Sequence, residues 1–269
     1  RVPLTMSGVR GNERIFAVPR AYSTAARAWM ERGLGLHGSA PRHGAATVFV
    51  RDGERGVETL MLHRPGRQSM GTLSFPGGVC ETSDDEPLDW HGPTPAQWAH
   101  KVLSEDIGRT RRSVVAAARK VFVETGILLA GTPGHGVAES VDGADWMTSR
   151  ERLAAEEFSF ADLLAKRSLT FHSECLRPLS HWITSDFIHQ RVDLQFYSAA
   201  VPVGQRPVPL ATQRGVACSI GWTRAPCSRT RGPHRCRSCS GASRRKPASP
   251  TTPGTSTSTS SRPPGCSAP

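Results

Sequence analysis

Apolar and polar positions first show a strand pattern in the middle of the chain. Apolar and β-branched residues fill positions 46–50, and apolar residues recur through 58–64; the Asp- and Gly-containing segment 52–57 separates the two runs. This pattern predicts two strands joined as a hairpin. A third short strand is predicted over residues 73–75. It ends at Pro76-Gly77-Gly78, because proline cannot donate to a strand ladder and glycine permits positive φ.

Helical periodicity is clearest over residues 113–125, where apolar side chains recur every three or four positions. Gly126 follows directly and predicts the end of this helix. The remaining patterns predict helical segments at 21–32, 95–105 and 150–166 and strands at 176–183 and 192–201.

Charge is distributed unevenly along the 269 residues. The chain has 34 Lys and Arg against 23 Asp and Glu, for a formal net charge of +11. Residues 1–193 hold all 23 acidic residues and 23 basic ones, so the excess of 11 lies entirely in residues 194–269. The basic character therefore belongs to the end of the chain, and a domain specific for nucleic acid is not expected.

The end of the chain also lacks the residues that build a core. Residues 221–269 contain no Leu, Ile, Val, Phe, Met or Tyr. Such a segment cannot bury enough apolar surface to offset about 1–2 kcal/mol of backbone entropy per residue. We expect a loosely ordered lead-in over 1–44, a domain over 45–210 with an insert at about 85–110, and a basic disordered tail over 211–269.

Three interpretations of the tail remain open. It could be the product of a shifted reading frame, because the amino-acid composition changes abruptly near residues 214–222. It could bind polyanions without specificity through its arginines. It could hold zinc through cysteines and a histidine, although their spacing fits no standard module; these residues are Cys227, His234, Cys236 and Cys239.

Several protein classes are not expected. No run of 18 apolar residues is present, so no membrane partner is predicted, and the first 30 residues lack the apolar core of a secretory signal. Only Cys80 and Cys175 lie in the first 193 residues, which is too few for a disulfide framework. We therefore expect a cytoplasmic protein.

The candidate chemistry lies in two segments, residues 77–84 and 119–127. Together they resemble the Nudix box, Gly-x5-Glu-x7-Arg-Glu-apolar-x-Glu-Glu-x-Gly-apolar. Gly78 takes the position of the first glycine and Asp84 that of the first glutamate. The later positions are matched by Arg119, Glu124, Gly126 and Ile127.

The chain departs from this box in two ways. Thirty-four residues separate Asp84 from Arg119, where the box has seven. Lys120 and Val123 stand where the box has glutamates, so one helical carboxylate remains of three. The long insert resembles the Nudix subgroup that includes a peroxisomal coenzyme A diphosphatase and bacterial relatives, and the resemblance covers about residues 45–205.

This resemblance implies an α/β/α sandwich with a mixed sheet. It also implies metal-dependent hydrolysis of a nucleoside diphosphate linked to another group, including a coenzyme A-like one, with Mg²⁺ or Mn²⁺ as cofactor. Such an ion neutralises the diphosphate and lowers the pKa of bound water. The oligomeric state is left open.

The resemblance assigns roles to individual residues. Glu124 and Arg119 are the catalytic candidates. Glu124, Glu81 and Asp84 are the candidate metal ligands. Gly77, Gly78 and Arg64 are the candidates for the loop and substrate contacts. Because Lys120 would repel a divalent cation, the first alternative is an impaired module that binds nucleotides without cleaving them, or a defective product. The second is polyanion binding through the tail.

Overall fold

The computed structural model describes residue 18 and residues 20–32, 39–54, 56–63, 73–210, 212–213, 216–217 and 219–224. The α-helices are α1 (Ser23–Glu31), α2 (Pro95–Lys101), α3 (Ile107–Thr125), α4 (Ala144–Ala154) and α5 (Phe160–Lys166). The short 3-10 helices are η1 (Arg20–Tyr22), η2 (Thr82–Asp85) and η3 (Ser173–Cys175). The strands are β1 (Arg42–Gly53), β2 (Gly56–His63), β3 (Leu73–Ser74), β4 (Gly77–Val79), β5 (Trp90–His91), β6 (Ala130–Gly131), β7 (Thr170–His172), β8 (Arg177–Ile183), β9 (Val192–Ala199), β10 (Thr212–Gln213), β11 (Val216–Ala217) and β12 (Ser219–Arg224).

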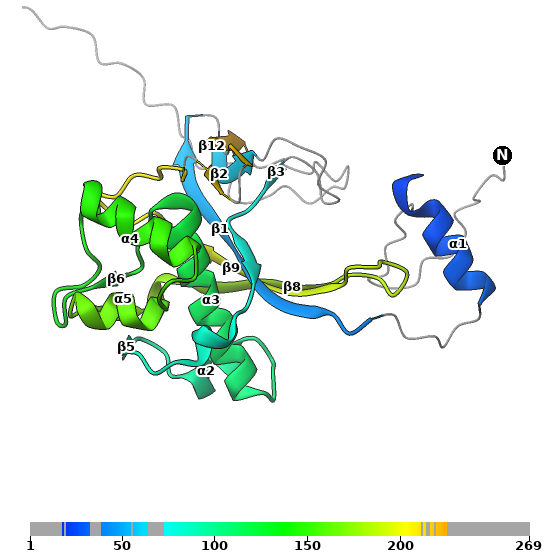
Figure 1. Cartoon of the computed structure of the whole chain (residues 1–269), viewed down its shortest axis with the longest axis horizontal. Helices are drawn as coiled ribbons and strands as arrows, with labels where there is room; N and C mark the ends of the chain where they lie inside the picture. Colours follow the sequence, from blue (N-terminus) through cyan, green and yellow to red (C-terminus); the bar gives the residue numbers. More distant parts are fainter. Residues whose placement is uncertain are drawn as a thin grey trace, which may run out of the picture. The chain divides into compact units, whose positions relative to one another are not determined.

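The main sheet is mixed. Among the described residues its strands follow the order β12-β2-β1-β9-β8, with β3 paired to β2 and β4 paired to β1. Strands β1 and β9 run parallel, and the other pairs are antiparallel. The long β1 passes through the centre of Figure 1 with β9 and β8 beside it. This sheet and its helices confirm the predicted α/β class with a mixed sheet.

The first hairpin forms where the sequence predicts it. Strands β1 and β2 pair antiparallel, and Gly53 lies opposite Gly56 at the turn. A second, smaller sheet is formed by β5, β7 and β6. In it β5 and β7 run parallel, with His91 opposite His172.

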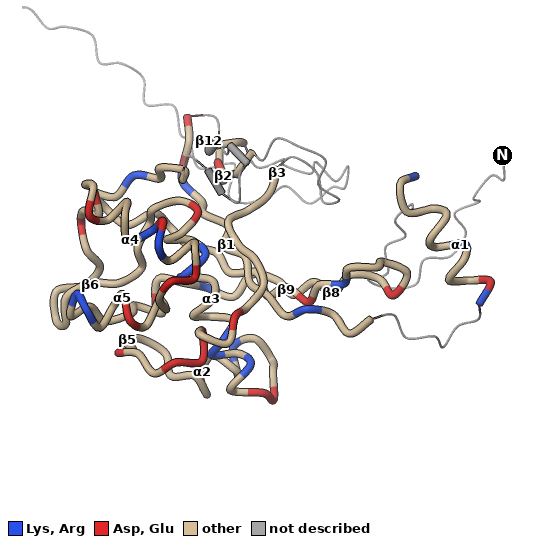
Figure 2. Tube along the Cα trace, viewed as in Figure 1, with Lys and Arg blue, Asp and Glu red and all other residues tan. Residues whose placement is uncertain are grey.

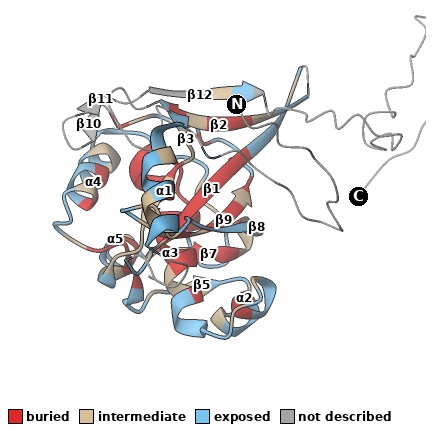
Figure 3. Cartoon of the chain, turned by 90° about the vertical axis from the view of Figure 1, so that its right-hand side faces the viewer, coloured by how far each residue is buried: buried red, intermediate tan, exposed pale blue. Residues whose placement is uncertain are grey.

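Helix α3 is the central helix of the domain. It packs against β1 and β4, and α2 and α4 pack against it. Its apolar side chains from Val114 onward are buried in one core with residues of β1 and the small sheet, and Figure 3 shows buried segments along the helix. Gly126 ends the helix in a left-handed conformation with φ of 76°, as the sequence predicts.

Helix α3 begins six residues before the predicted start at Ser113. Residues 107–112 carry too few apolar side chains to show periodicity, but the Asp106 side chain accepts a hydrogen bond from the Arg109 N–H at 2.8 Å and caps the helix. The predicted helical region 150–166 is two helices. A break with positive φ at Glu156 separates them, and Ser159 starts α5 with a capping box.

Two predicted boundaries differ from the structure. Strand β1 begins at Arg42, inside the expected lead-in. Strand β12 lies inside the expected tail, yet it pairs with residues 58–63 of β2. Trp222 explains the second difference, because its side chain packs against the core and its ring lies 4.1 Å from the Arg51 guanidinium. Disorder and a shifted frame beyond Arg224 are expectations for residues outside the described part of the chain.

Acidic and basic side chains are interspersed over the described elements (Figure 2), in line with the neutral balance of residues 1–193. Within the described residues, every helix is too short or too polar to cross a lipid bilayer.

Candidate functional site

The glycine turn at the start of β4 is joined to the end of α3. The Gly77 N–H donates to Oε2 of Glu124 at 2.8 Å. Gly77 and Gly78 lie opposite Ala46 and Ala45 of β1, and a Cβ at Gly77 would stand 2.5 Å from the Ala45 carbonyl oxygen. The close approach of the two strands therefore requires glycine here, and it places the turn directly beside the Glu124 carboxylate.

A buried ion pair ties α3 to the segment that follows β4. Arg119 donates from Nε to Oδ1 of Asp84 at 2.6 Å and from a terminal nitrogen to Oδ2 at 2.8 Å. Asp84 is fully buried and Arg119 is 2% exposed. Burial alone would lower the pKa of Arg119, but the hydrogen bonds and charge of Asp84 raise it. Arg119 therefore stays protonated and holds η2 against the helix.

Glu81 accepts hydrogen bonds from two cations. Its Oε1 lies 2.8 Å from Nζ of Lys120 and 2.8 Å from a terminal nitrogen of Arg119. Burial alone would raise the pKa of Glu81, but the hydrogen bond from Lys120 and the charge of Arg119 lower it. The Lys120 stem passes over the glycine turn, where a Cβ at Gly78 would stand 3.1 Å from its Cε. The Lys120 ammonium thus lies between the turn and Glu81.

The donor set does not fit the divalent ion that the resemblance implies. Both carboxylate oxygens of Asp84 accept hydrogen bonds, since Oδ2 also receives the Glu81 N–H at 2.7 Å. Val123 offers no lone pair, and the Lys120 ammonium holds the Glu81 oxygen that would face an ion. The positive charges of Lys120 and Arg119 offset those of Glu81 and Asp84, and a fixed positive charge beside these carboxylates repels Mg²⁺ or Mn²⁺.

A cleft of about 390 Å³ opens on the η2 side of Arg119. It reaches from η2 to α5, and four carboxylate side chains line it: Glu81, Glu86, Glu156 and Asp162. Its excess of negative charge disfavours a phosphate group. A phosphate ligand is therefore better placed on the glycine side of Lys120 than in this cleft.

The structure describes six of the predicted site residues. It brings five of them into contact, Gly77 with Glu124, and Glu81 and Asp84 with Arg119. Gly78, the sixth, adjoins Lys120. Arg64 lies outside the described residues. The sequence analysis did not predict the ion pair of Lys120 with Glu81. The sequence feature that could have indicated this pair is a basic residue, Lys120, at a glutamate position of the box, together with an acidic residue, Glu81, three positions after Gly78.

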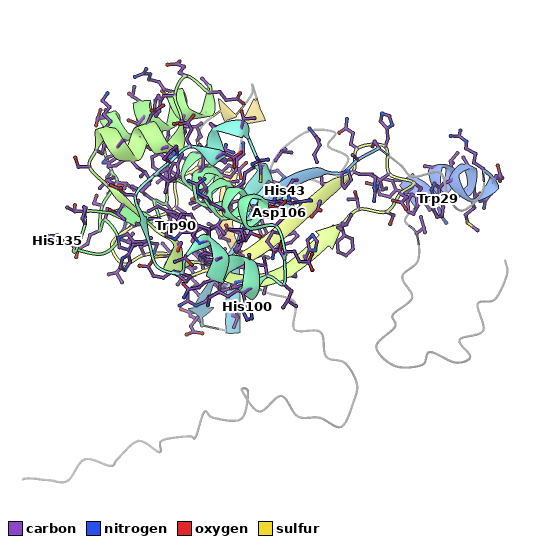
Figure 4. The ribbon with its side chains drawn as sticks, turned by 90° about the horizontal axis from the view of Figure 1, so that it is seen from below. Trp29, His43, Trp90, His100, Asp106 and His135 are labelled. Carbon is purple, nitrogen blue, oxygen red and sulfur yellow. The ribbon has the colours of Figure 1, made fainter. Side chains whose placement is uncertain are left out.

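A second polar group lies at the other end of α3. His43 of β1 accepts a hydrogen bond at Nδ1 from Nε of Arg109. The Arg109 N–H in turn donates to the Asp106 side chain, and His43 and Asp106 are labelled in Figure 4. Burial and the Arg109 charge lower the pKa of His43. This group joins α3 to β1 and has no contact with the glycine turn among the hydrogen bonds of the described residues.

Comparison with solved structures identifies the fold. A Nudix hydrolase from Alicyclobacillus acidocaldarius matches with a TM-score of 0.51 and 22% identity, over 67% of this chain and 79% of that one. A MutT NUDIX hydrolase from Burkholderia pseudomallei matches with a TM-score of 0.32 and 14% identity, over 68% and 83% of the two chains. The NUDIX domain of Shewanella oneidensis NrtR, complexed with ADP ribose, matches with a TM-score of 0.33 and 10% identity, over 73% of this chain and 80% of that one.

No protein-family model matches the chain, and no curated protein matches it significantly. The first of these structural matches confirms that the chain has the fold of Nudix hydrolases.

Proposed function

We propose that this Nudix-fold protein binds a nucleoside diphosphate linked to another group and does not cleave it by the metal-dependent route. One observation carries the proposal. The ammonium of Lys120 is paired with Glu81 at 2.8 Å, at a position where the Nudix box has a glutamate. The resemblance to the box and the shared fold support the class of ligand.

Charge explains why binding and cleavage separate here. A bound divalent ion would neutralise phosphate oxygens, polarise phosphorus and generate a hydroxide from water. Lys120 can attract a phosphate oxygen as a point charge, but an ammonium cannot activate water. The residues therefore support recognition of the diphosphate more than its hydrolysis.

The phosphates are expected beside the glycine turn. Gly78 has no side chain, so the Lys120 stem can cross it at 3.1 Å from the position of a Cβ. Lys120 remains 17% exposed and can reach a ligand from there. The hydrogen bond between Gly77 and Glu124 fixes the turn in place. In this proposal Arg119, Asp84 and Glu81 position the turn and the lysine rather than hold an ion.

Hydrolysis and binding of coenzyme A, ADP-ribose and NADH, each with Mg²⁺ and with Mn²⁺, test the proposal. We expect the native chain to bind at least one of them in calorimetry without releasing product. The double variant Lys120→Glu, Val123→Glu restores two helical carboxylates and is expected to gain metal-dependent hydrolysis. Lys101→Glu, on the exposed end of α2, makes a comparable charge change away from the site and should remain inactive.

Two results would overturn the proposal. Product formation by the native chain at the rate of the double variant would assign it hydrolase activity, with Glu124 and Arg119 as the catalytic residues. Absence of binding to all three nucleotides would remove the recognition role.

A further inference from the structure

A second cluster of polar side chains lies in the small sheet, separate from the glycine turn. His91 of β5 and His172 of β7 are register partners in a parallel pair, and Glu174 follows in η3. One possible ligand atom of each residue lies within 4.8 Å of the other two. We propose that His91, His172 and Glu174 bind a zinc-class transition-metal ion.

Two distances in the cluster are close to those of a tetrahedral site. Nε2 of His91 lies 3.6 Å from Oε1 of Glu174, and Nδ1 of His172 lies 2.7 Å from the same oxygen. Zinc bonds of about 2.0–2.1 Å at tetrahedral angles separate two ligand atoms by about 3.3 Å. The first pair needs almost no movement. The second is a hydrogen bond that would open by about 0.6 Å when the ion replaces its proton.

Two buried atoms of the cluster have no hydrogen-bond partner. They are Nε2 of His172 and Oε2 of Glu174, and the His172 side chain is only 6% exposed. Among the described residues, the only side chains that pair with the Glu174 carboxylate are the two histidines. The Glu174 side chain as a whole is 37% exposed, but its Oε2 is buried, and a bound cation would offset the unfavourable burial of this charged oxygen.

The surrounding backbone holds the ligands in place. Ser173 donates from Oγ to the His91 carbonyl oxygen at 2.9 Å, and the His172 N–H donates to the Leu129 carbonyl oxygen at 2.9 Å. Gly92 lies directly over the carboxylate, where a Cβ would stand 2.5 Å from Oε2 of Glu174. A side chain at this position would displace Glu174, so glycine keeps the cluster compact.

The chemistry of the ligands selects the ion. Imidazole nitrogen with one carboxylate suits zinc and its neighbours, whereas Mg²⁺ prefers an all-oxygen shell. The His91 side chain is 65% exposed, so an ion can enter on its side and keep one coordination position for water. None of the three ligands takes part in the contacts at Gly77, Glu81 or Glu124.

The test is titration of the full chain with Zn²⁺ against a chromophoric chelator, and with Co²⁺ for its visible spectrum. We expect one tight Zn²⁺ site and the d–d bands of tetrahedral Co²⁺. His91→Ala and Glu174→Gln should weaken it by about 100-fold or more, beyond the 10–100-fold typical of an outer-shell partner. His91 is exposed, so its replacement leaves the core intact.

His100→Ala is the matched control. His100 is an exposed histidine on α2, labelled in Figure 4, and its loss should leave the affinity unchanged. Mg²⁺ should not compete. Equal Zn²⁺ affinity in native chain, His91→Ala and Glu174→Gln would overturn the proposal. So would strong thiolate charge-transfer bands with Co²⁺, which would assign the ion to cysteines. Neither result depends on whether the protein binds or cleaves nucleotides.

Discussion

The N–H of Gly77 and the Oε2 of Glu124 lie 2.8 Å apart although 47 positions separate them in the chain. The bond joins the first residue of β4 to the last turn of α3. Because the carboxylate accepts from a residue of β4, and β4 pairs with β1, its orientation is fixed by the sheet. The turn and the helix end therefore form one rigid unit, on which the ion pairs of Arg119 and Lys120 are built.

The first prediction concerns the buried ion pair. Asp84→Asn removes the charge that accepts two hydrogen bonds from the buried Arg119 guanidinium and leaves only the partly exposed Glu81 to pair with it among the described residues, so the free energy of unfolding should fall by about 3 kcal/mol. Urea denaturation measures this. Asp85→Asn is the control, since Asp85 pairs with Arg112 from the same two elements, but both side chains are about 40% exposed. That change should stay below about 1 kcal/mol. Equal losses in the two variants would show that burial does not set the strength of the first pair.

The second prediction concerns the close approach at the glycine turn. Gly77→Ala places a methyl group 2.5 Å from the Ala45 carbonyl oxygen and 2.6 Å from the Ala46 Cα, so stability should fall by about 1–3 kcal/mol. Gly108→Ala in the exposed first turn of α3 meets only a carboxylate oxygen at 3.6 Å. It should stabilise the protein by about 0.5–1 kcal/mol through helix propensity. Thermal unfolding of both variants checks the opposite signs.

The third prediction concerns pH. The folded pKa of Glu81 lies below its ordinary value of 4.5, because Lys120 and Arg119 together outweigh burial. The stability that this carboxylate contributes is therefore fully present above pH 4.5 and lost as the pH falls through the lowered pKa. In Lys120→Met the hydrogen bond from the ammonium is gone, so the folded pKa of Glu81 rises toward its ordinary value, and the loss of stability becomes smaller and is complete at a higher pH. Unfolding curves between pH 3 and 6 follow it. Superimposable pH profiles of variant and native chain would contradict the role of Lys120.

Local patterns predicted those parts of the fold that depend on neighbours in sequence. The β1–β2 hairpin and the helix end at Gly126 each follow from a few adjacent residues. The start of α3 could not be predicted in this way, because its polar first turn shows no periodic apolar positions. Its boundary depends instead on one capping residue, Asp106. The break between α4 and α5 depends on the Ser159 capping box, a signal weaker than the periodicity on either side.

Site geometry was predictable only where a motif linked distant residues. The box resemblance paired Gly78 with Glu124 across the long insert, and the structure places Gly77, the residue directly before Gly78, in contact with Glu124. The pairing of Lys120 with Glu81 is a tertiary contact between two positions that the box treats separately. The cluster of His91, His172 and Glu174 left even less trace, since the parallel pairing of β5 with β7 creates it from residues about eighty positions apart.

Strand β12 sets a practical limit on how the domain can be shortened. It covers one side of β2 from Glu58 to His63. A chain cut after residue 210 would leave that row of amide and carbonyl groups unsatisfied, and an open strand of this kind recruits further copies by edge-to-edge association. Shortened forms that retain Arg224 should remain monodisperse in light scattering, whereas those ending at 210 should form aggregates that grow with concentration.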